Sequence, residues 1–91
     1  MTVLINAASV DTESAEVAAA GAVIVSVVGT FKQGYVKVTA DIGSGEATAL
    51  TVTPGDQTKI YRLEFATGVT FKAYLVGVDS GSSVTVEYID V

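Results

Sequence analysis

The sequence predicts an all-β protein, a single antiparallel β-sandwich of about seven or eight strands, with the jelly roll as one topology that fits. Three observations predict it. Apolar and polar residues alternate with a period of two along most of the chain. Turn signals containing Gly, Ser or Pro separate the alternating stretches at intervals of about 8–12 residues. Val and Thr, whose branched side chains favour strands, recur in these stretches.

The first of these stretches is an apolar strand expected at residues 2–7. The chain of 91 residues has the size of one domain, so residues 1–91 are expected to form one sandwich. Residues 1–10 are expected to serve as an N-terminal arm or strand that pairs with the sheet edge of a neighbouring subunit. Residues 15–20 fit either a strand or a short alanine-rich helix. Strand is favoured because the rest of the chain alternates with a period of two.

Residues 22–28 are the most apolar run, and a central strand covered on both faces is expected there. Later strands are expected at residues 35–42, 47–53, 58–65, 69–78 and 83–91, and the strongest turn signal lies at residues 53–56. Ile42 is expected to point inward with its alternating neighbours. The other inward positions predict a core of Val36, Val38, Leu50, Val52, Leu63, Phe65, Phe71, Leu75, Val84 and Val86.

The charge of the chain argues against several classes of partner. The net charge is −5 with only five basic residues, so no basic stripe is available for nucleic acid or for an anionic membrane surface. No stretch reaches the roughly 18 apolar residues of a membrane span. Residues 1–6 lack the basic start of a secretion signal. We therefore expect synthesis in the cytoplasm and neither a nucleic-acid nor a membrane partner.

The residue types offer little for catalysis. The chain contains neither His nor Cys, which removes the commonest general base, the strongest nucleophile and the usual Zn²⁺ ligands. Glu13 and Glu16 are close in sequence, but solvated turn and edge charges explain them better than a catalytic pair. Residues 11–13 and 79–80 supply oxygen ligands of the kind Ca²⁺ needs, without the spacing of a calcium loop. Aspartates in turns commonly cap backbone N–H groups. We expect a protein that is not an enzyme and has no cofactor or metal.

The low charge instead predicts a surface covered by a partner. Charged residues make up 16% of the chain, against about 25% on average. Large side chains at outward positions are candidate contacts, because exposed tyrosines and aliphatic groups are typical of interfaces. The candidate interface residues are Val3, Leu4, Ile5, Tyr35, Ile60, Tyr74 and Ile89.

Three segments carry a resemblance to a known family. Residues 29–38 read GTFKQGYVKV, residues 66–75 read ATGVTFKAYL, and residues 81–86 read GSSVTV. In this order, separated by a middle rich in Gly, Ser and Thr, they resemble small β-sandwich virion proteins of tailed bacteriophages. The resemblance covers about two-thirds of the chain.

The resemblance implies a head decoration, or cement, protein on the outer capsid surface of a virion. Such a protein binds the lattice of major capsid protein, and a homo-oligomer, a trimer or dimer, is expected. The resemblance carries over no catalytic residue. Two alternatives stay open: a receptor- or carbohydrate-binding module of a tail or fibre, and a self-assembling shell or filament subunit. Against the carbohydrate module, the chain has no Trp, and Asn6 is its only Asn.

Overall fold

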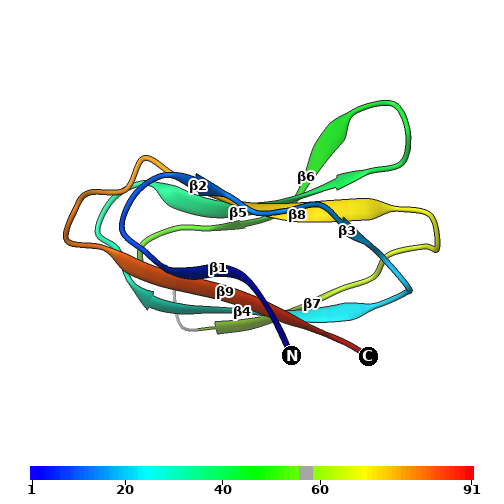
Figure 1. Cartoon of the computed structure of the whole chain (residues 1–91), viewed down its shortest axis with the longest axis horizontal. Coiled ribbons are helices and arrows are strands. Elements are labelled where there is room, and N and C mark those ends of the chain that lie inside the picture. The colour runs from blue at the N-terminus through cyan, green and yellow to red at the C-terminus, as the bar shows by residue number, and fades with distance from the viewer. Residues whose placement is uncertain (56–58) are drawn as a thin grey trace.

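A computed structural model describes residues 1–55 and 59–91, which form strands, turns and loops and no helix (Figure 1). The strands among these residues are β1 (Thr2–Ala8), β2 (Thr12–Glu13), β3 (Val17–Ala18), β4 (Val23–Thr30), β5 (Tyr35–Asp41), β6 (Glu46–Val52), β7 (Lys59–Leu63), β8 (Thr70–Val76) and β9 (Ser83–Asp90). The all-β prediction is confirmed. For residues 15–20 the strand interpretation is correct and the helix is not, because β3 pairs with β8. Of the expected turn at 53–56 and strand at 58–65, Asp56 and Thr58 lie outside the described residues.

The strands form two antiparallel sheets that face each other (Figure 1). One sheet has the order β1-β9-β4-β7, and the other has the order β2-β8-β5-β6, with β3 also pairing with β8. Because β2 and β3 follow each other along β8, they act as one interrupted edge strand. We call the first sheet the β4–β9 sheet and the second the β5–β8 sheet.

The strand order has the topology of a jelly roll. When β2 and β3 are counted together, the first strand pairs with the last, the second with the next to last, and so on to the central β5–β6 hairpin. This long folded hairpin is rolled up by two further pairings, β4 with β9 and β5 with β8. Eight strands in two sheets connected in this way define the jelly roll. The sandwich expected from the sequence is therefore correct.

The core lies between the sheets and follows the alternation of the strands. Seven of the ten predicted core residues are buried, namely Val36, Val38, Val52, Phe71, Leu75, Val84 and Val86. The other three, Leu50, Leu63 and Phe65, are partly buried and pack against this core. The inward side chains of β4, Val23, Val25 and Val27, are fully buried as well.

Phe71 of β8 is the largest fully buried side chain and joins the two sheets. Its ring stacks on Phe65 with 5.0 Å between the ring centroids and 15° between the ring planes. Its edge contact with Tyr88 of β9, in the opposite sheet, has centroids 5.2 Å apart and planes at 85°. Aromatic pairs prefer both arrangements, which add to the stabilisation from burial alone.

Residues 2–8 are an edge strand of the sandwich and not a free arm. β1 pairs with β9 of its own chain, from Thr2 opposite Tyr88 to Ala8 opposite Val84. Ile5 is 1% exposed and belongs to the core. Two register shifts interrupt this pairing. Irregular pairing of this kind makes an edge strand a poorer template for further strands.

Two other expectations are wrong. Residues 22–28 are not covered on both faces, because the outward residues Ile24 and Ser26 are half-buried and Val28 is 45% exposed. Ile42 does not point into the core but is 79% exposed. It lies beyond the end of β5 in the loop of the β5–β6 hairpin, which projects from the sandwich (Figure 1).

Gly29 marks a close approach between the central strands of the β4–β9 sheet. It lies opposite Val84 of β9 and has a φ of 125°. A Cβ atom at this position would overlap the backbone carbonyl of Ser83. Only glycine fits this site, because the strand backbone, unlike a side-chain tip, cannot move aside without losing its pairing.

Replacing Phe71 with Ala is expected to lower the free energy of unfolding by about 3–5 kcal/mol, because it removes the ring between the sheets and leaves a cavity. Urea unfolding measures the loss. Ile42→Ala at the exposed hairpin loop is the matched control, with an expected change within about 0.5 kcal/mol. A loss for Phe71→Ala as small as that of the control would contradict the packing described here.

Replacing Gly29 with Ala is expected to cost more stability than replacing Gly43 with Ala, by upwards of about 1 kcal/mol. Both glycines have positive φ, but a Cβ at Gly43 meets nothing within 4 Å. The comparison of urea midpoints therefore isolates the clash with Ser83 from backbone strain. Equal losses in the two variants would show that the strands are not this close.

Candidate functional site

The outer face of the β5–β8 sheet carries a polar cluster, which consists of Glu13, Thr39, Glu46, Lys72 and Tyr74. Lys72 and Tyr74 point outward because Phe71, Ala73 and Leu75 between and beside them point into the core. Register places Glu13 opposite Tyr74, and Thr39 opposite Lys72. Strands far apart in sequence thus bring these side chains together.

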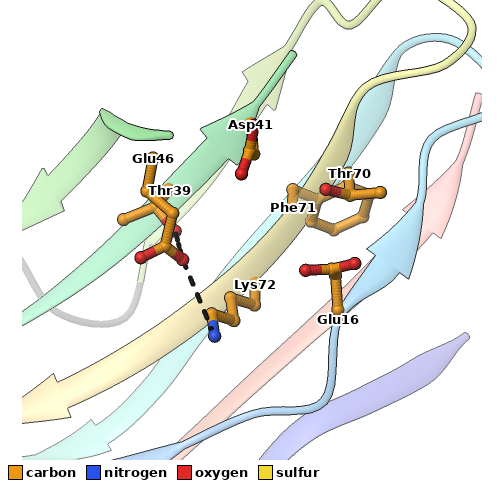
Figure 2. Close-up of a pocket in the computed structure, with 7 residues that line it drawn as sticks. All are labelled: Glu16, Thr39, Asp41, Glu46, Thr70, Phe71 and Lys72. Atoms are coloured by element: carbon orange, nitrogen blue, oxygen red, sulfur yellow. Dashed lines mark hydrogen bonds and ion pairs between the residues drawn. The ribbon is translucent and has the colours of Figure 1, made fainter. Parts of the chain in front are cut away.

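The side chains of the polar cluster form hydrogen bonds and ion pairs with each other. Lys72 Nζ lies 2.5 Å from Glu13 Oε2 and 3.7 Å from Glu46 Oε1, and Figure 2 shows Lys72 and Glu46 turned toward each other. The Tyr74 hydroxyl donates to both Glu46 carboxylate oxygens at 2.7 and 2.9 Å, and the Thr39 hydroxyl donates to Glu46 Oε1 at 3.0 Å. Lys37 and Lys72 also lie 4.9 and 5.3 Å from the centre of the Tyr74 ring.

These contacts change the acidity of three groups. The hydrogen bond from Tyr74 is the main cause that lowers the pKa of Glu46, and those from Thr39 and Lys72 add to it. The hydrogen bond to Glu13 raises the pKa of Lys72. Desolvation, followed by donation to Glu46, raises the pKa of Tyr74. Each shift favours the protonation state that holds the cluster together at neutral pH.

One hollow beside the polar cluster is too small for a substrate. It is lined by Glu16, Thr39, Asp41, Glu46, Thr70, Phe71 and Lys72 (Figure 2). It has no room for a water molecule. A second, open hollow of about 240 Å³ is lined by Asp11, Thr12, Glu13, Tyr74, Leu75 and Val76. The two glutamates considered as a catalytic pair are engaged differently: Glu13 pairs with Lys72, and Glu16 lines the smaller hollow.

The turn aspartates accept hydrogen bonds from neighbouring loop residues. Asp11 accepts the N–H groups of Gly77 at 2.8 Å and Val78 at 3.2 Å, which joins two loops. Asp79 accepts the hydroxyl of Ser82 at 3.0 Å. Within residues 1–55 and 59–91, no group of three or more acidic side chains is placed to hold a metal ion.

The outer face of the β4–β9 sheet is apolar at its centre. We call Val3, Ile24, Val28, Ile60 and Ile89 the apolar face. The outward positions lie in rows across the strands: Ile24 of β4 lies between Ile89 of β9 and Arg62 of β7. In the next row Ser26 lies between Glu87 of β9 and Ile60 of β7. The small Ser26 leaves a groove of about 250 Å³, lined by Met1, Ile24, Ser26, Ile60, Glu87, Tyr88 and Ile89.

The apolar face is unusually exposed for a folded chain. Ile60 is 73% exposed, and Val3 and Ile89 are 49% and 47% exposed. Single exposed aliphatic residues are ordinary, but neighbouring ones on a flat sheet form a patch that is typical of a protein interface. This contiguity makes the apolar face the candidate functional site.

The candidate interface residues divide between three places. Val3, Ile60 and Ile89 lie on the apolar face, with Val3 and Ile60 on its two edge strands. Tyr35 and Tyr74 are half-buried on the opposite sheet, where Tyr74 belongs to the polar cluster. Leu4 is half-buried and packs against the core, which includes Ile5, so Ile5 offers no surface to a partner. The sequence interpretation missed Ile24 and Val28, because it took residues 22–28 to be covered on both faces.

Comparisons with known proteins leave the family open: no protein-family model, no curated protein and no solved structure matches the chain. The structure contains no helix among the described residues that is long and apolar enough to cross a membrane.

Replacing Glu46 with Gln is expected to remove part of the acid sensitivity of folding. The pKa of Glu46 in the folded chain lies below its ordinary value of 4.5. Its carboxylate therefore stabilises the fold above that value, and the stabilisation is lost as the pH falls through the lower folded pKa. Urea midpoints near neutral pH and near pH ~3 should differ more for the wild type than for Glu46→Gln. Asp90→Asn, on the other sheet, controls for the loss of one charge. An equal acid loss in wild type and Glu46→Gln would contradict the role of the cluster.

Proposed function

We propose that this chain is a structural virion protein without catalytic activity, which binds the assembled major capsid protein lattice of a tailed phage and stabilises it. The observation that carries a binding role is the apolar face. Burying one large aliphatic side chain contributes about 1.5–3 kcal/mol. Several such side chains, left in water by the isolated chain, favour an assembled working form, a homo-oligomer on the outer surface of the capsid.

The arrangement of polar groups also favours binding over catalysis. The carboxylates and the lysine of the polar cluster are engaged with each other, and the hollow lined by Glu16 and Glu46 has no room for a water molecule. An enzyme needs polar groups that are held ready for a reacting atom. In this cluster the contacts stabilise the sheet.

The phage assignment rests on the resemblance of residues 29–38, 66–75 and 81–86. In this fold those segments do structural work: Phe31 and Phe71 are buried, and Gly29 permits the approach of β4 to β9. The resemblance therefore supports a shared fold of small virion proteins, and the apolar face supports an assembled form of the chain. A protein that binds only the assembled lattice shifts the equilibrium toward assembly, and many weak contacts on one lattice add up to firm attachment.

The purified chain is expected to bind heads assembled from the major capsid protein of the same genome. Co-sedimentation should show saturable binding with a fixed ratio to the capsid subunits, and bound heads should unfold at a higher temperature than bare heads. Unassembled capsid protein should bind much less.

Two matched variants test whether attachment to heads depends on the apolar face. Ile60→Lys on the apolar face should weaken attachment, whereas Val10→Lys, at a position that is 65% exposed outside the face, should leave it unchanged. A folded wild-type chain that does not bind heads saturably overturns the capsid assignment.

A further inference from the structure

The apolar face carries two charges of opposite sign at diagonal corners. In one row the order across β9, β4 and β7 is Ile89, Ile24 and Arg62. In the next row the order is Glu87, Ser26 and Ile60. Glu87 and Arg62 thus occupy one diagonal of this array, and two isoleucines, Ile89 and Ile60, occupy the other.

The array is a short rectangle. Strands in a sheet lie about 4.8 Å apart and next-but-one residues in a strand about 6.8 Å apart, so its sides measure roughly 10 Å and 7 Å. A two-fold axis along the isoleucine diagonal therefore brings each of the other two corners to within roughly 4 Å of the opposite corner's position, a distance that the long side chains of Glu and Arg can span. It sets Glu87 of one copy against Arg62 of a second copy, and the reverse, while Ile89 and Ile60 meet their own counterparts near the axis.

We propose that two copies of this chain pair through the apolar face about such a two-fold axis, with Glu87 of each copy against Arg62 of the other. A two-fold interface requires a self-complementary surface, and the diagonal arrangement of like isoleucines and opposite charges has this property. The strands of the two copies cross steeply, as in orthogonal sheet packing. The groove above Ser26 receives an aliphatic side chain of the second copy.

Both charges are available for this contact. Among the described residues, the side chain of Glu87 makes no hydrogen bond or ion pair, although it is half-buried on the apolar face. Arg62 pairs with Glu64 at 2.7 Å, and both side chains are more than half exposed. An exposed pair of this kind contributes little, so Arg62 gains by turning to a carboxylate that becomes buried at an interface.

The pairing deepens the proposed function, because it names a second copy as the occupant of the apolar face. A pair presents two copies of every remaining surface to a lattice. Attachment of such a pair is bivalent, which strengthens binding without any new contact.

Sedimentation velocity of the purified full chain, without capsids and over two decades of concentration, tests the pairing. The wild type is expected to show a monomer–dimer equilibrium. Glu87→Arg and Arg62→Glu should each weaken the dimer by roughly tenfold or more, because each places like charges opposite each other. The double variant carrying both changes should restore most of the affinity.

Ile60→Lys should abolish the dimer, and Ile42→Lys, at the exposed hairpin loop, is the matched control that should not. Urea unfolding of each variant confirms that it folds.

A monomeric wild type, or a dimer unaffected by Ile60→Lys, overturns the pairing. A dimer that Ile60→Lys breaks but the double charge exchange does not restore overturns the two-fold arrangement. If the wild type binds heads but sediments as a monomer, the pairing is refuted and the capsid assignment is not. If the wild type forms the dimer but does not bind heads, the capsid assignment is refuted and the pairing is not.

Discussion

The contact of Phe71 with Tyr88 is the interaction on which the rest of the structure depends. It joins β8 and β9, the strands that lie inside their respective sheets, and so fixes which face of each sheet points inward. Because side chains alternate strictly along a strand, a shift of one residue would reverse every face. With Phe71 inward, Lys72 and Tyr74 must point to solvent and meet Glu46. With Tyr88 inward, Glu87 and Ile89 must lie on the opposite outer surface. The two outer faces, polar and apolar, follow from one buried aromatic pair.

The sequence was sufficient to predict which side chains point inward in the strands whose outward positions are polar. In β8 and β9, Lys72, Thr85 and Glu87 alternate with buried Val, Ala, Phe and Leu, and the inward set was predicted correctly. It was insufficient for β4, because Ile24 and Val28 are as apolar as the residues beside them, so the period of two is hidden. Ile42 continues the alternation of β5 but lies just past the end of that strand, in the hairpin loop, and the alternation does not record where the strand ends.

The sequence predicted several residues of the candidate site but not how they are arranged in space. Ile60 and Ile89 were recognised singly, as large side chains at polar positions. Ile60 and Ile89 lie on either side of Ile24 because β7 and β9 flank β4. This strand order is a property of the jelly roll and not of any single segment. The ion pair of Lys72 with Glu13 joins residues 59 positions apart, and no local pattern predicts it. Sequence thus indicates which residues are exposed, and topology decides which of them become neighbours.

The position of β9 between β1 and β4 has a consequence for biosynthesis. Strand β9 follows all the other strands in sequence but lies inside its sheet, so β1 and β4 both lack this partner until β9 has been synthesised. Pairings between distant parts of a chain are slow to form, and strands with open edges are prone to aggregate while they wait. During synthesis β1 and one edge of β4 therefore stay unpaired until β9 emerges from the ribosome, and the sheet closes only then. Yield in the cell is then governed by the time between synthesis and closure as well as by the stability of the finished fold.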